Sequence, residues 1–137
     1  MYRVVLISCA SKKLKHRAKA REIYISTLFK FNLKYAEKLK VDAIYILSAK
    51  YGLITLDEEV NTYDLTLNTM SSSEIRLWAE NVIEQIKAIT PIDDTEFIFL
   101  AGNNYRKNLL PFIKYSKIPL KGLRIGEQLK KLKGLIG

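Results

Sequence analysis

The chain has 137 residues, 48% hydrophobic and 27% charged, which excludes a disordered protein, because such a chain buries too little apolar surface to offset its ordering entropy. This length predicts one domain over residues 1–137. No apolar run approaches the roughly 20 residues that cross a bilayer, and no signal peptide is visible. The lone cysteine, Cys9, has no internal disulfide partner. We therefore expect a cytoplasmic protein without a membrane segment.

The net charge is +9, from 23 Lys and Arg against 14 Asp and Glu. Such an excess favours a polyanionic partner, with nucleic acid the first candidate, although it also serves solubility alone. The positive charge concentrates in two segments, 12–21 and 114–133, and acidic residues lie between them at 57–59 and 93–94.

The first half of the chain alternates between strand and helix patterns. A β-branched, apolar run predicts a buried strand over 2–8. After a basic loop, apolar residues at mostly four-residue intervals predict one helix over 20–39. A second strand is expected over 43–47, and an irregular stretch over 53–70 is too long to be idle in a compact domain.

The second half repeats the alternation. Ser71 and Glu74 form a capping-box pair that predicts the start of a helix, which Pro91 ends. The remaining expected elements are a strand over 97–101, a short helix over 105–112, an edge strand over 118–120 and a final helix over 127–132. The pattern predicts an α/β protein, a three-layer α/β/α sandwich around a mostly parallel sheet of about four strands.

Three polar loops follow the three predicted central strands, at 8–13, 48–52 and 102–106. Ligands of open α/β sheets bind at the carboxyl ends of the strands. Each loop has small residues followed by a cation, which suits an anionic or nucleobase-bearing ligand. The expected ligand-binding residues are Ser8, Cys9, Ser11, Lys12, Lys13, Ser48, Tyr51, Gly102, Tyr105 and Arg106.

Lys50 and Asp64 are the candidate catalytic residues. Lys50 follows a buried strand, where partial burial would favour a nucleophilic or basic amine; alternatively its stem packs on the sheet and its amine reaches water. Asp64 either serves as a general acid or base, holds a cation in place, or initiates a turn. Cys9 is either a thiolate nucleophile beside Lys12 and Lys13 or an inert core residue.

No metal site or cofactor is expected. The single histidine, His16, has no metal-ligand spacing around it. P-loop, G-x-G-x-x-G and G-x-S-x-G patterns are absent.

Taken in order, the segments ISCASKK, YILSAKYGLI, YDLTL, FLAGNNYRKNLLPFI and PLKGLRIGEQLKKL resemble DUF6884, a family of small bacterial, archaeal and phage proteins. The resemblance covers nearly the whole chain and implies an α/β sandwich, with no established activity.

More remotely, the first loop is similar to the catalytic domain of archaeosine synthase, which acts on a deazaguanine base in transfer RNA and has a uracil-DNA-glycosylase-like fold. Its cysteine and lysine, four residues apart, correspond to Cys9 and Lys13. Leu14 and Lys15 stand where that motif has proline and tyrosine, and its later histidine is absent.

These observations lead to the hypothesis of an enzyme that acts on a nucleobase or nucleotide, free or within nucleic acid. Base removal, base exchange and base modification are the candidate reactions. The alternative is a non-catalytic, basic nucleic-acid-binding module whose affinity depends on the two positively charged segments.

Overall fold

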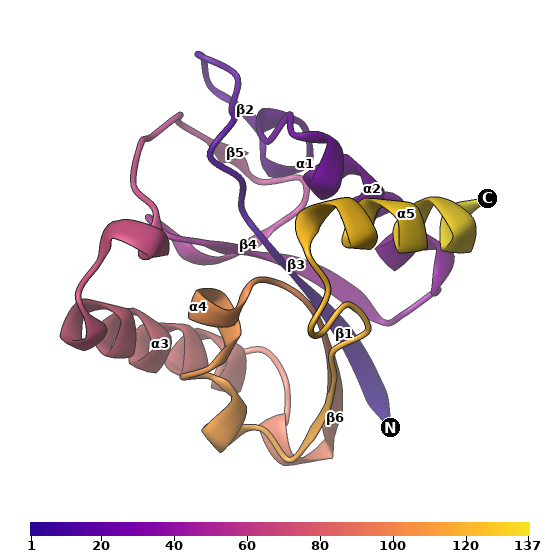
Figure 1. Ribbon diagram of the computed structural model, residues 1–137. Helices are drawn as coiled ribbons and strands as arrows, with labels where there is room; N and C mark the ends of the chain where they lie inside the picture. The colour runs from indigo at the N-terminus through magenta and orange to yellow at the C-terminus, as the bar shows by residue number, and fades with distance from the viewer.

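The structure, a computed structural model, describes residues 1–137 and is built around a five-stranded sheet with the order β4-β3-β1-β6-β7 (Figure 1). The strands are β1 (Tyr2–Ser8), β3 (Ala43–Ser48), β4 (Gly52–Thr55), β6 (Thr95–Leu100) and β7 (Tyr115–Lys117). All neighbours pair in parallel except β4, which is antiparallel to β3. The sheet is mostly parallel, as predicted, with five strands where about four were expected.

Helices cover both faces of this sheet and give the predicted three-layer α/β/α sandwich (Figure 1). On one side, α2 (Thr27–Lys38) packs against α5 (Ile125–Ile136) and β1. On the other side, α3 (Ser72–Lys87) packs against β4. Two short helices are α1 (Ala20–Ile23) and α4 (Asn103–Arg106). Three single turns of 3-10 helix are η1 (Leu67–Thr69), η2 (Ile92–Asp94) and η3 (Leu110–Phe112). A separate two-stranded ribbon pairs β2 (Ala18–Lys19) with β5 (Glu59–Val60).

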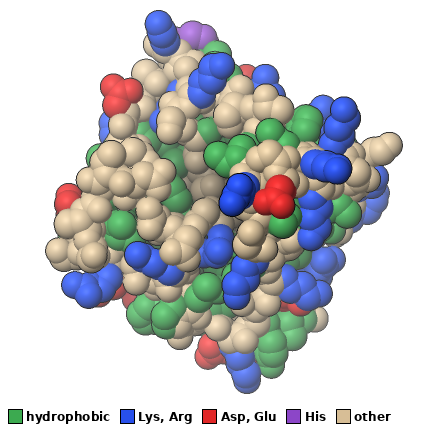
Figure 2. Space-filling view, viewed as in Figure 1, with side chains coloured by type: hydrophobic (Ala, Val, Ile, Leu, Met, Phe, Trp, Pro, Cys, Tyr) green, Lys and Arg blue, Asp and Glu red, His purple; other side chains and the backbone are tan.

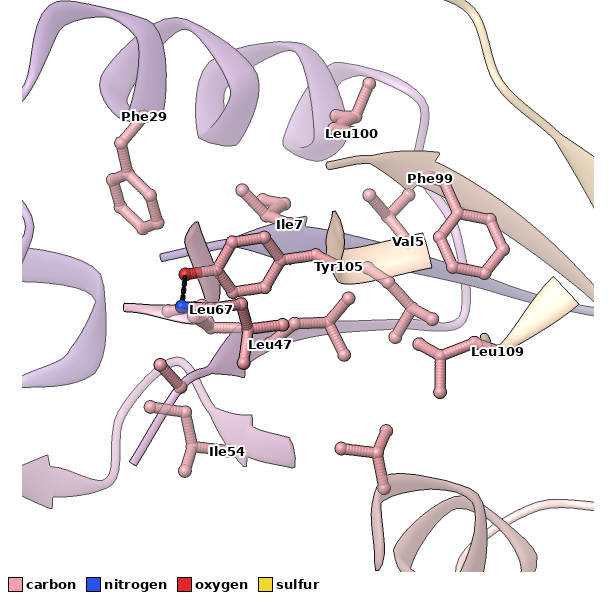
Figure 3. Close-up of a cluster of buried hydrophobic side chains, with 14 of the residues drawn as sticks. Val5, Ile7, Phe29, Leu47, Ile54, Leu67, Phe99, Leu100, Tyr105 and Leu109 are labelled. Carbon is pink, nitrogen blue, oxygen red and sulfur yellow. Dashed lines mark hydrogen bonds between the residues drawn. The ribbon is translucent and has the colours of Figure 1, made fainter. Parts of the chain in front are cut away.

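The centre of the core is β1, whose residues 4–7 are almost completely buried. It is flanked by β3 and β6, so both of its edges are paired and both of its faces are covered, which is why its sequence is a continuous apolar run. Figure 3 shows Val5 and Ile7 of this strand among Leu47, Phe99 and other buried side chains. None of the helices combines the length and apolar content that a bilayer crossing requires.

The prediction of a single helix over 20–39 is wrong, because the structure has two helices there, α1 and α2. The chain is extended between them, and this segment pairs with the basic loop: Leu14 N donates to Ile23 O at 2.8 Å, and Ile25 N donates to Lys12 O at 3.0 Å. Ser26 then caps α2, because its Oγ accepts a hydrogen bond from Phe29 N at 3.2 Å.

The last part of the chain also departs from the expected elements. The edge strand is Tyr115–Lys117, directly before the predicted segment 118–120, which instead forms a turn closed by the 3.1 Å bond from Lys121 N to Ile118 O. Pro119 has no N–H to donate, so the pairing ends before it. The final helix, α5, is longer than the predicted 127–132.

The stretch 53–70 is not wholly irregular. Gly52 has a positive φ of 73°, so the chain reverses after β3 and β4 pairs back onto it. The rest of the stretch contributes β5 and the turn η1.

Candidate functional site

The order of the parallel strands reverses at β1, since β3 follows on one side of it and β6 on the other. The loops that leave two such strands diverge toward opposite faces of the sheet and leave a crevice between them. A pocket of about 330 Å³ lies at this position, and we call it the β1–β6 pocket. Its lining residues are Ser8, Cys9, Leu28, Asn32, Asn68, Leu100, Ala101, Gly102, Asn103, Asn104, Tyr105, Ile125 and Gln128.

The lining of the β1–β6 pocket is polar but carries no Lys, Arg, Asp or Glu. Five of its side chains are amides: Asn32, Asn68, Asn103, Asn104 and Gln128. Asn104 Nδ2 donates to Asn68 Oδ1 at 3.0 Å and Gln128 Nε2 donates to Leu123 O at 2.9 Å, and the other amide atoms have no partner in the protein. Leucine and isoleucine side chains from α2, β6 and α5 complete the wall. A lining of uncharged polar side chains beside apolar ones suits an uncharged ligand that has several donors and acceptors of its own.

Asn32 is the most deeply buried amide of this pocket, with 4% of its surface exposed. It lies in α2 between Phe29 and Ala36, the other buried residues of that helix. Its Oδ1 is buried without a hydrogen-bond partner. Leaving such a group unpaired costs about 1–3 kcal/mol, and a ligand would recover this free energy once the side chain turns its oxygen toward the pocket.

Tyr105, in α4, joins the loop after β1 to the segment that leads into η1. Its hydroxyl oxygen lies 3.5 Å from both Cys9 Sγ and Thr66 Oγ1. It also accepts a hydrogen bond from Leu67 N at 3.3 Å, drawn in Figure 3. Burial, together with the nearby Cys9, raises the pKa of Tyr105 to about 12, so the phenol stays protonated at neutral pH.

A second, smaller pocket of about 50 Å³ adjoins the first and shares Cys9, Asn68 and Tyr105 with it. We call it the Lys13 pocket, because Lys13 is the one Lys or Arg side chain that lines either cavity. Burial lowers the pKa of Lys13, while the negative charges that Cys9 and Asp64 can carry partly oppose this effect.

The Lys13 amine is held over an aromatic surface. Its Nζ lies 4.3 Å from the centre of the Tyr63 ring and 5.8 Å from that of the Tyr24 ring. It donates one long hydrogen bond, of 3.4 Å, to Ser11 O. None of the ion pairs of the structure includes Lys13. Its charge therefore remains available to a ligand.

A buried chain of hydroxyl groups fixes these rings. Tyr63 Oη lies 2.6 Å from Tyr24 Oη and 2.8 Å from Ser48 Oγ. Burial raises the pKa of both tyrosines, which keeps their hydroxyls neutral. Ser48 Oγ also accepts from Tyr51 N at 3.0 Å, and Ser48 O accepts from Trp78 Nε1 at 2.9 Å. Ser48, expected to bind a ligand, is thus buried within the supporting structure.

The chain matches the family of unknown function DUF6884 over residues 4–134. It belongs to this family. The match includes every residue that lines the two pockets. No curated protein and no solved structure gives a significant match to the chain.

The three loops predicted at the sheet edge contribute unequally to the pockets of this family member. Ser8, Cys9, Gly102 and Tyr105 line the β1–β6 pocket, and Ser11 and Lys13 line the Lys13 pocket. Lys12 is exposed and lines neither cavity. Arg106 Nη1 donates to Ala101 O at 2.6 Å and braces the turn after β6.

Lys50 and Tyr51, from the loop after β3, line a separate depression together with Trp78, Asn81 and Gln85. Lys50 is exposed, with its Nζ 5.4 Å from the centre of the Tyr51 ring, so the partial burial expected of it is not observed. Asp64 is exposed as well, but it lies close enough to Lys13 to affect the pKa of that amine.

Asn32, Asn68 and Gln128 were not predicted from the sequence, because they lie in α2, η1 and α5 and not at the ends of strands. One signal was present: Asn32 is an amide on the otherwise apolar face of an amphipathic helix. No group of three or more His, Cys, Asp or Glu side chains is placed to hold a metal ion.

Proposed function

We propose that this protein is an enzyme that acts on a nucleobase or nucleotide, free or within nucleic acid, and that the base enters the β1–β6 pocket. The observation that carries the proposal is the uncharged lining of this pocket, with five amide side chains and the unpartnered Oδ1 of Asn32. A base is planar, uncharged and edged with alternating donors and acceptors. Asn and Gln side chains pair with such edges through two hydrogen bonds at once.

Groups able to take part in chemistry lie beside this pocket. The Cys9 thiol lines both cavities, next to the protonated hydroxyl of Tyr105, and the Lys13 amine lies in the smaller cavity. A thiol, a phenol and an amine are among the groups that enzymes use as nucleophiles and proton carriers. They are compatible with base removal, exchange or modification. A base within a duplex would first have to be flipped out, at a cost of a few kcal/mol.

Asp64 and Lys50 take different parts in this proposal. Asp64, near Lys13, would adjust the charge and orientation of that amine. Lys50 lines a separate depression and is exposed, so we assign it to contact with an extended nucleic acid rather than with the base.

The test is calorimetric titration of the protein with free bases and with the four ribonucleosides, followed by mass spectrometry of any ligand that binds. The wild type is compared with Asn32→Leu, which keeps the branched shape and removes the amide, and with Asn81→Leu at an exposed site. We expect binding that Asn32→Leu weakens at least tenfold and Asn81→Leu leaves unchanged, and a bound ligand whose base is released or altered. Absence of binding, or equal affinity in all three proteins, would refute the base pocket.

The alternative, a non-catalytic nucleic-acid-binding module, is favoured by the exposed charge. Lys12, Lys15, Arg17 and Lys19 are all exposed on the segment after β1. Figure 2 shows further Lys and Arg side chains on several sides of the hollow beside α5. Such a module would lose about 0.9 in log K per phosphate contact on duplex DNA for each tenfold rise in salt. It would be weakened by Lys12→Ala with Lys15→Ala and unaffected by Asn32→Leu.

A further inference from the structure

The two adjoining cavities differ in charge. The β1–β6 pocket has no Lys or Arg in its lining, so it has no counter-charge for a phosphate. The Lys13 pocket has one, and it shares Cys9, Asn68 and Tyr105 with the larger cavity. A single ligand with an uncharged part and an anionic part would match both cavities.

The Lys13 ammonium has N–H donors free to bind an anion. An ammonium has three N–H donors, and the one protein acceptor that it reaches is Ser11 O, at 3.4 Å. The Tyr63 ring holds it from one side, 4.3 Å away, and that ring is fixed by its bonds to Tyr24 and Ser48. The amine is thus positioned, partly shielded from water and unpaired, which strengthens its attraction for a negative group.

The volume of the Lys13 pocket limits what enters it. At about 50 Å³, it is much smaller than the β1–β6 pocket of about 330 Å³, so it suits the smaller, anionic part of such a ligand rather than a second ring.

We propose that the Lys13 pocket is the phosphate subsite of the ligand whose base enters the β1–β6 pocket, and that the substrate is therefore a nucleotide or a phosphodiester-linked nucleotide rather than a free base. This inference rests on the proposed function. Asp64, the acidic group that acts on Lys13, is exposed and forms no ion pair with it, so it weakens this subsite without closing it.

The experiment compares the four ribonucleosides with their 5′-monophosphates by calorimetry at one fixed ionic strength. For each protein, the ratio of the two dissociation constants gives the contribution of the phosphate. The wild type is compared with Lys13→Met and with Lys12→Met, a matched change at the neighbouring exposed lysine that lines neither pocket. Lys13→Gln is a second variant, so that the result does not depend on one substitution.

In the wild type, the phosphate is expected to tighten binding roughly tenfold to 100-fold, the range of a hydrogen bond to a charged group. Lys13→Met and Lys13→Gln should reduce this ratio to near one while the nucleoside binds within about twofold of its original affinity, and Lys12→Met should keep the ratio. A ratio that persists without Lys13, or a wild type that binds nucleosides and monophosphates equally, would overturn the phosphate subsite and leave the base pocket standing. Failure of every nucleoside and monophosphate to bind would instead refute the base pocket on which the proposed function rests.

Discussion

The hydroxyl oxygen of Tyr63 lies 2.6 Å from that of Tyr24, and both side chains are buried. This pair joins the segment between α1 and α2 to the segment between β5 and η1, which are 39 residues apart. Ser48, at the end of β3, extends the chain of hydroxyls by a 2.8 Å contact with Tyr63. The floor beneath Lys13 is therefore made of three distant segments that are held together by buried hydrogen bonds.

Tyr63→Phe is expected to destabilise the protein by about 1–3 kcal/mol, because it leaves the buried hydroxyls of Tyr24 and Ser48 without their shared partner. The measurement is urea unfolding of the mutant and the wild type. Tyr51→Phe is the control, since the Tyr51 hydroxyl makes one long bond of 3.4 Å to Asn61 O in an exposed setting. Equal losses in both mutants would contradict the structural importance of the Tyr63 hydroxyl.

Local sequence patterns were enough to predict most of the fold. The apolar runs of β1, β3 and β6 and the capping box of α3 are each formed by neighbouring residues, and the structure places them within about two residues of their predicted bounds. The division between α1 and α2 was not predicted, because it depends on hydrogen bonds from a loop about ten residues away. The three residues of β7 are all exposed and have no strand pattern of their own, since their pairing depends on the open edge of β6.

The candidate site was predicted in part. The loops after β1 and β6 contribute to one pocket, as the rule for parallel strands requires, because those strands are neighbours. The loop after β3 does not, although β3 also neighbours β1, because the hairpin to β4 turns it toward α3. Local patterns could not predict which lysine is partly buried, because the Lys13 amine lies over the rings of Tyr24 and Tyr63, and Tyr63 lies in a distant segment between β5 and η1.

Gly52→Ala is expected to destabilise the protein by roughly 1–3 kcal/mol, because a side chain is strained at a φ of 73°. The added Cβ would also collide with Gln85, whose Oε1 accepts a hydrogen bond from Leu53 N at 2.9 Å and so supports β4. Thermal unfolding measures the change. Gly134→Ala, in the open on α5, is the control and should stabilise by up to about 1 kcal/mol. A neutral Gly52→Ala would show that the hairpin tolerates a different turn.

Glu74 should make stability depend on pH in the acid range. Ser71 N donates a hydrogen bond of 3.0 Å to Glu74 Oε1, and this bond lowers the pKa of Glu74 below its ordinary value of 4.5. The unfolded chain then takes up the proton first, so the stabilisation is complete above pH 4.5 and is lost as the pH falls through the folded-state pKa. Unfolding curves of wild type and Glu74→Gln should therefore differ at pH 7 and converge in acid. A constant difference at every pH would contradict this linkage.

The Lys13 amine should lose its proton more readily than an ordinary lysine. Burial lowers its pKa, so its reaction with an acylating reagent, followed by peptide mass spectrometry across a pH series, should show a midpoint below 10.5. A bound nucleoside monophosphate should move this midpoint upward, because an anion stabilises the charged amine. A midpoint at or above 10.5 in the free protein would contradict the burial of Lys13.

The Asn32 side chain is expected to lower the stability of the free protein and to be needed for ligand binding. Its Oδ1 is buried without a partner, so Asn32→Leu, which has the same branching and no polar atoms, should stabilise the free protein by about 1–3 kcal/mol. Leucine also favours helices more than asparagine does, and Asn81→Leu, on the exposed face of α3, measures that smaller contribution separately. Thermal unfolding of both mutants gives the difference. If Asn32→Leu gains more stability than Asn81→Leu and loses base binding, the amide is retained for its ligand. If it destabilises the free protein, Asn32 has a structural partner, and the case for the base pocket weakens with it.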